Sequence, residues 1–195
     1  NISFGKEEIE YLRSLGTFGE DFLSRLAGFK FKGDVRALPE GTVVFPNEPL
    51  MVIKGSVFEA QLLEAALLNI VNFQTLIATK AARVVRAARG RGVLEFGLRR
   101  AQAPDAAVYG ARAAVIGGCV GTSNVLASML FDTEPKGTHA HSWVMSFDDE
   151  LSAFRAYAEL YPTNCLLLID TYDTLKSGLP NAITVFRELK EKVFP

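Results

Sequence analysis

The chain has 195 residues, of which 49% are hydrophobic and 22% charged, a composition typical of a globular domain and not of a disordered or fibrous protein. Its formal charge of -1 provides no overall field for capturing nucleic acid, so an anionic ligand would need local groups of Arg and Lys. We therefore expect no nucleic-acid partner.

The expected compartment is the cytoplasm, and no membrane association is expected. The two cysteines, Cys119 and Cys165, lie in apolar runs and are interpreted as reduced core residues, not as a disulfide. No apolar run is expected to reach the roughly 20 residues that a membrane span requires. Residues 1–12 carry four charges where a signal peptide would need an apolar core.

The first half of the chain predicts a small α+β region. Residues 6–27 have apolar positions at helical spacing broken by Gly16, which predicts two short helices. Between Gly33 and Gly55, short β-rich runs alternate with Pro and Gly, which predicts a set of strands and turns that includes residues 43–45. Residues 57–89 contain neither Gly nor Pro and predict one long helix or a closely joined pair.

The end of that helix is rich in cations. They are Lys80, Arg83, Arg86 and Arg89. The simpler interpretation is a solvated face that complements the negative end of the helix dipole. The alternative is a surface that attracts phosphate or contacts another subunit.

The second half alternates predicted strands and helices. Strands are expected at residues 93–96, 113–120 and 165–170, with helices from 104, over 123–130, over 148–161 and over 180–192. Alternating β and α units indicate a parallel sheet or barrel, so the fold class is α/β.

Reactive side chains follow these strands. Arg99 and Arg100 come after the first strand, Ser123 after the second, and Asp170 at the end of the last, while His141 belongs to an intervening unit. Ligands of parallel sheets and barrels bind beyond the carboxyl ends of the strands, so these groups are expected to converge on one mouth.

The two histidines, His139 and His141, allow more than one interpretation. At positions i and i+2 of an extended segment they would point to one side, as in a His-x-His metal site. Such sites usually need a third or fourth ligand, and the chain has no other histidine, so no metal site is expected and His139 is interpreted as structural. Asp170, in a turn with the hydroxyl of Thr171, either caps the following helix, binds ribose hydroxyls or orients a catalytic group. Phe96 could stack on a flat ring beside the arginines, or be a core residue.

Five segments together resemble the nicotinate phosphoribosyltransferase family. They are Glu-Phe-Gly-Leu-Arg-Arg-Ala (95–101), Pro-Asp-Ala-Ala (104–107), Gly-Gly-Cys-Val-Gly-Thr-Ser-Asn (117–124), Lys-Gly-Thr-His-Ala-His-Ser-Trp (136–143) and Asp-Thr-Tyr-Asp-Thr-Leu-Lys-Ser-Gly (170–178). The resemblance implies a type II phosphoribosyltransferase fold: part of an irregular α/β barrel over residues 92–195, incomplete at its carboxyl end, beside a smaller α+β domain over residues 1–91. Family chains are about twice as long, so this chain resembles a fragment.

The resemblance also implies an activity. Family members join nicotinate to 5-phosphoribosyl-1-diphosphate, forming nicotinate mononucleotide and diphosphate in NAD biosynthesis. The reaction is coupled to hydrolysis of ATP, with Mg²⁺, through a phosphorylated histidine. They act as homodimers with shared active sites.

The family's site residues map onto this sequence one by one. The phosphohistidine corresponds to His141 and its neighbouring acid to Asp170. The pyridine-binding residues correspond to Phe96 and Arg99, with Thr122 and Ser123 also expected at the substrate.

Ser123 favours nicotinate, because the nicotinamide-using relative has an Asp there, which would repel a carboxylate. The open alternatives are a nicotinamide- or quinolinate-using relative, a His-x-His metal-dependent hydrolase, and a non-catalytic interaction module.

Overall fold

The computed structural model describes residues 2–193, and it divides into two compact units, residues 1–120 and 121–195, each described here by itself. The elements are mixed α/β in class, dominated by helices. The predicted division at residues 91 and 92 stays a prediction.

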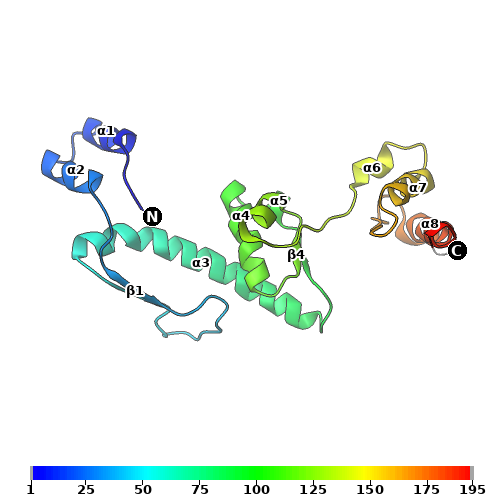
Figure 1. Ribbon diagram of the computed structural model, residues 1–195, viewed down its shortest axis with the longest axis horizontal. Helices are drawn as coiled ribbons and strands as arrows, with labels where there is room; N and C mark the ends of the chain where they lie inside the picture. Colours follow the sequence, from blue (N-terminus) through cyan, green and yellow to red (C-terminus); the bar gives the residue numbers. More distant parts are fainter. Residues whose placement is uncertain (1, 194–195) are drawn as a thin grey trace. The chain divides into compact units, whose positions relative to one another are not determined.

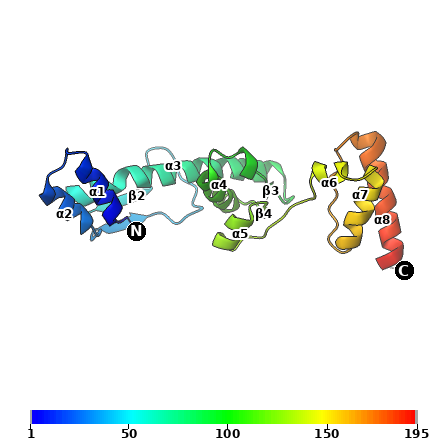
Figure 2. The ribbon, with the colours of Figure 1, turned by 90° about the horizontal axis from the view of Figure 1, so that it is seen from above.

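The first unit begins with a helical hairpin. Helices α1 (Lys6–Ser14) and α2 (Glu20–Ala27) pack on each other and on the start of α3 (Val57–Ala87), as Figures 1 and 2 show. Their core consists of Ile9, Leu23 and Leu26, against which Phe58 and Leu62 of α3 pack. The two short helices predicted for residues 6–27 are confirmed.

A two-stranded antiparallel sheet follows, formed by β1 (Asp34–Ala37) and β2 (Met51–Lys54), with Asp34 opposite Lys54. The strand predicted around residues 43–45 is wrong, because that segment lies in the long connection between β1 and β2.

Helix α3 is a single helix of 31 residues, so the first of the two sequence-based alternatives is confirmed. It starts with a reciprocal capping box, in which the Ser56 hydroxyl accepts from the Glu59 N–H and the Glu59 carboxylate accepts from the Ser56 N–H. Among the described residues it is the one helix long and apolar enough to cross a membrane. The expectation that no segment approaches this length is therefore wrong, although a single such helix is weak evidence for a membrane span.

The first unit ends with β3 (Leu94–Glu95), the 3₁₀ turn η1 (Leu98–Arg100) and α4 (Pro104–Ile116), which packs along α3 (Figure 1). The strand predicted for residues 113–120 is wrong: its first part is the end of α4, where Ala113 and Ala114 are buried. A Cβ on Gly117 would lie 2.5 Å from the Ala78 carbonyl oxygen, so the absence of a side chain permits this close helix contact.

The second unit begins with β4 (Gly121–Thr122) and α5 (Val125–Phe131). Helices α6 (His141–Met145), α7 (Glu150–Leu160) and α8 (Leu179–Val193) follow, with a π-helical turn, η2 (Thr174–Gly178), leading directly into α8. Figure 2 shows α7 and α8 side by side, where Arg155 donates two hydrogen bonds to Glu188 at 2.9 and 2.6 Å.

An extended segment, residues 165–170, completes the core of these helices. Its alternate residues Cys165, Leu167 and Ile169 pack against the buried side chains of Val144, Phe154 and Val185, among others. The predicted strand there is nevertheless not formed, because within residues 2–193 no main-chain hydrogen bond joins this segment to another. Cys119 is buried and Cys165 is half-buried, as predicted for core cysteines, and burial raises the pKa of both thiols.

Candidate functional site

His141 is the first residue of α6, and its side chain meets the end of the extended segment 165–170. Its Nδ1 lies 3.1 Å from the Thr171 hydroxyl, a hydrogen-bond distance, and its Nε2 lies 3.8 Å from the Asp170 carboxylate. The side chains of His141 and Asp170 are 47% and 58% exposed, so solvent screens their attraction but both remain accessible to a ligand. The structure thus brings the predicted pair together and adds Thr171 as a direct partner.

Asp170 does not cap the helix that follows it. That position belongs to Asp173, whose carboxylate accepts from the main-chain N–H groups of Leu175 and Lys176 at 3.1 and 2.9 Å. The capping interpretation of Asp170 is therefore wrong, and its carboxylate is available to His141.

His139 points inward, unlike His141. It is 8% exposed, and its Nε2 accepts a hydrogen bond of 3.0 Å from the Leu168 N–H. The side chains of the two histidines therefore do not point to the same side, as they would in an extended segment, because helix α6 begins directly after Ala140. Within the described part of the chain, no group of three His, Cys, Asp or Glu side chains could hold a metal ion.

Thr122 and Ser123 precede α5. Thr122 is fully buried, and its hydroxyl accepts from the Asn124 N–H at 3.0 Å, while the Asn124 side chain caps α5. Ser123 is half-buried, and within residues 121–193 the side chain of His141 contacts Thr171 and Asp170 and not Ser123.

Phe96 and Arg99 belong to the first unit. Phe96 follows β3 and is 39% exposed, and the exposed Arg99 lies in η1. The neighbouring Arg100 donates to the Phe96 carbonyl at 3.0 Å and so fixes the turn that presents both side chains. Phe96 is more open to a ligand than a core residue would be.

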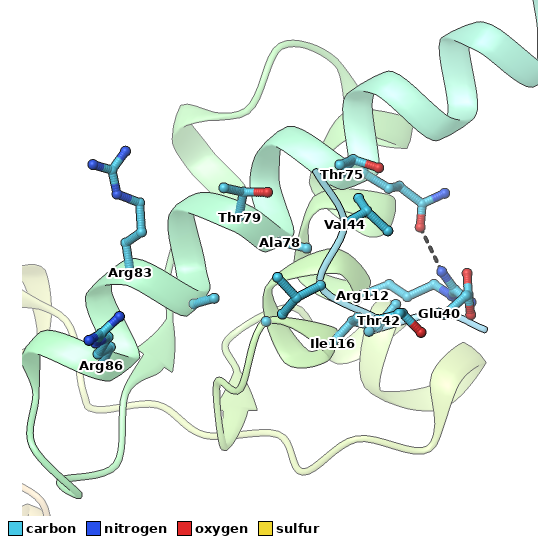
Figure 3. Close-up of a pocket in the computed structure, with 15 residues that line it drawn as sticks. Glu40, Thr42, Val44, Thr75, Ala78, Thr79, Arg83, Arg86, Arg112 and Ile116 are labelled. Carbon is cyan, nitrogen blue, oxygen red and sulfur yellow. Dashed lines mark hydrogen bonds and ion pairs between the residues drawn. The ribbon is translucent and has the colours of Figure 1, made fainter. Parts of the chain in front are cut away.

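The first unit also contains a cavity of about 540 Å³ between α3, α4 and the loop at residues 40–44 (Figure 3). Arg112 lies on one side, where it donates a hydrogen bond of 2.7 Å to Gln74 and forms an ion pair with Glu40. Arg83 and Arg86 of the cationic helix end also line the cavity. None of the predicted site residues lines this cavity.

Comparison with known proteins gives consistent matches. The family model described as nicotinate phosphoribosyltransferase N-terminal domain matches residues 1–72, and that described as the nicotinate phosphoribosyltransferase family matches residues 92–182. A nicotinate phosphoribosyltransferase of Mycobacterium tuberculosis is 50% identical over 95% of the chain and 40% of its own length. That of Bacillus subtilis is 49% identical over 99% of the chain and 39% of its own length.

Solved structures agree with these matches. Human nicotinic acid phosphoribosyltransferase superposes with a TM-score of 0.85 at 32% identity, covering 98% of this chain and 48% of that one. A nicotinate-nucleotide pyrophosphorylase from Pyrococcus furiosus gives 0.70 at 29% identity, covering 90% and 44%.

Both family models describe one class of enzyme, the phosphoribosyltransferases. Within that class, this chain belongs to the nicotinate phosphoribosyltransferase family. It spans about 40% of the length of the curated relatives with which it shares half its residues.

Proposed function

We propose that the protein to which this chain belongs joins nicotinate to 5-phosphoribosyl-1-diphosphate, forming nicotinate mononucleotide and diphosphate in NAD biosynthesis. The observation that supports this most directly is 50% identity to a nicotinate phosphoribosyltransferase over 95% of the chain. The type II fold, an irregular α/β barrel beside a smaller α+β domain, belongs to the same proposal. So do its expected action as a homodimer with shared active sites and its cytoplasmic location.

His141 is proposed to accept the terminal phosphoryl group of ATP. A ring nitrogen with a free lone pair attacks the phosphorus and the bond to ADP breaks, leaving phosphohistidine, which water later hydrolyses. The Thr171 hydroxyl holds one ring nitrogen at 3.1 Å and so fixes the rotation of the ring. The Asp170 carboxylate, 3.8 Å from the other nitrogen, offsets the positive charge that the ring acquires.

The ATP coupling brings Mg²⁺ into the proposal. The described residues offer no three-ligand metal group. Mg²⁺ commonly binds through one or two carboxylates together with substrate phosphates, so we assign it to the phosphates of ATP and 5-phosphoribosyl-1-diphosphate.

Nicotinate recognition is proposed for four residues. Phe96 would stack on the pyridine ring, and Arg99 would pair with its carboxylate through a planar fork. Ser123 and Thr122 complete the substrate-binding set. An uncharged Ser at 123 can donate to a carboxylate, which favours nicotinate over nicotinamide as the substrate. The phosphohistidine motif around His141 argues against quinolinate. The burial of His139 removes the support for a His-x-His hydrolase.

The test is labelling of the complete gene product with ATP carrying a radioactive γ-phosphate. We expect acid-labile phosphate on wild type and on Thr184→Ala, a variant at an exposed position of α8, and none on His141→Ala. Equal labelling of wild type and His141→Ala would refute the assignment. Parallel assays with nicotinate, nicotinamide and quinolinate separate the three pyridine substrates.

A further inference from the structure

His139 joins two segments that are far apart in sequence. Its Nε2 accepts from the Leu168 N–H at 3.0 Å, and its Nδ1 lies 3.3 Å from the Ala140 carbonyl oxygen. A nitrogen that accepts must carry no proton, so Nε2 is bare and Nδ1–H donates to Ala140. Both contacts therefore require one neutral tautomer of the ring.

The surroundings of His139 hold the ring in this state and orientation. The Tyr157 ring meets it edge-on with centroids 4.8 Å apart, and the Phe154 ring lies at 5.8 Å. Burial is the main cause of a lowered pKa of His139, and the nearby His141 adds to it. The residue is thus a fixed hydrogen-bond acceptor inside the helical core of the second unit.

The position of this hydrogen bond relates it to the candidate site. His139 precedes His141 by two residues, and Leu168 precedes Asp170 by two residues. Within the described chain no hydrogen bond between main-chain groups fixes residues 165–170. The bond from the Leu168 N–H to the His139 ring therefore ties this segment to residues 139–141 in addition to the contacts of His141 with Asp170 and Thr171.

We propose that His139 is a positioning residue, which sets the distance from His141 to Asp170 and Thr171 by holding Leu168. This rests on the proposed phosphorylation of His141. The role differs from that of a core side chain, because it depends on the acceptor at Nε2 and not on volume alone.

Two variants distinguish the hydrogen-bond acceptor of the His139 ring from the volume that the ring fills. His139→Phe keeps an aromatic ring between Phe154 and Tyr157 but leaves the buried Leu168 N–H without an acceptor. His139→Gln places a carbonyl oxygen near the position of Nε2 and can restore the bond. In the complete gene product we expect His139→Phe to slow single-turnover phosphorylation of His141 by about tenfold or more. The KM for ATP should change less than about twofold, and His139→Gln should recover most of the rate.

A purely structural role would give a different pattern. The rate per folded molecule would then follow melting temperature, and Phe and Gln variants of equal stability would be equally fast. Equal rates for wild type and His139→Phe, or equal loss in both variants, would overturn the proposal.

A second measurement tests the positioning role of His139 independently of the proposed function. The ¹⁵N chemical shift of His141 Nδ1, assigned by its loss in His141→Ala, reports the hydrogen bond to Thr171. We expect this shift to change in His139→Phe and to return in His139→Gln, whether or not the protein is phosphorylated. Absence of phosphohistidine on wild type would refute the function, whereas an unchanged shift in His139→Phe would refute the positioning role.

Discussion

Gly178 is the residue at which one added methyl group should disturb the fold most directly. It lies at the end of η2, where a Cβ would be 1.8 Å from the Ile169 carbonyl oxygen and 2.7 Å from the Ile169 carbonyl carbon. Both are main-chain atoms of the residue immediately before Asp170. The two segments would have to separate by about 1.2 Å to reach the 3.0 Å that real Cβ atoms keep.

Two opposing contributions decide the effect of Gly178→Ala. Ala is favoured over Gly inside a helix by about 1 kcal/mol. Overpacking a filled site costs about 1–3 kcal/mol, and the upper part of this range applies because the clash is with main chain and not with a flexible side chain. We expect a net loss of about 2 kcal/mol in the free energy of unfolding.

Trp143 makes this measurable by urea denaturation. It is the single tryptophan of the chain and packs against the buried cluster of the second unit, so its fluorescence follows this unit. Gly137→Ala is the matched control, since a Cβ there meets nothing within 4 Å and its stability should change by less than about 0.5 kcal/mol. A Gly178→Ala chain as stable as wild type, with an unchanged denaturant slope, would refute the packing argument.

Four further outcomes are expected. Asp170→Asn keeps the shape but removes the charge beside His141, so phosphohistidine formation should fall at least about tenfold, and an unchanged rate in single-turnover labelling would contradict its role. Ser123→Asp introduces a like charge near the nicotinate carboxylate, so the ratio of kcat/KM for nicotinate over nicotinamide should fall on the order of 100-fold, while an unchanged ratio would place Ser123 outside the pocket. The lowered pKa of His139 means that the unfolded chain binds its proton more readily than the folded one. Its contribution to stability is therefore complete above about pH 6.5 and is lost as the pH falls towards the folded-state pKa, and His139→Gln should flatten this part of the urea stability profile. Ser56→Ala removes one half of the capping box of α3 and should destabilise the first unit by about 1 kcal/mol, followed by circular dichroism, with no change expected from Ser14→Ala.

The helices could be predicted because their signals are local. The apolar spacing of residues 6–27 and the Gly- and Pro-free stretch from residue 57 each specify a helix without reference to the rest of the chain. The apolar run at residues 113–120 could not be assigned in this way. A short apolar run fits a buried strand and a buried helix equally well, and the choice follows from the close approach of Gly117 to Ala78 on another helix.

In the candidate site, too, the features with a local sequence signal could be predicted and those that depend on distant contacts could not. The proximity of His141 and Asp170 followed from their motifs, and the hydroxyl of Thr171 was visible as a candidate in the turn after Asp170. The opposite orientation of His139 depends on a main-chain N–H 29 residues away, which periodicity does not encode. The absence of a third histidine did favour a structural His139, and the burial of its side chain agrees with that interpretation.

The extended segment 165–170 has a consequence for handling the chain in solution. Apart from the Leu168 N–H, which donates to His139, its main-chain donors and acceptors form no hydrogen bonds within residues 2–193. An unpaired run of this kind is a template on which a strand of another molecule can add. Leu166 of this segment is 48% exposed, so such an addition would also bury apolar surface. We therefore expect self-association of this chain to increase with concentration, and the Leu168 amide, already bonded, to be the weakest point of that intermolecular ladder.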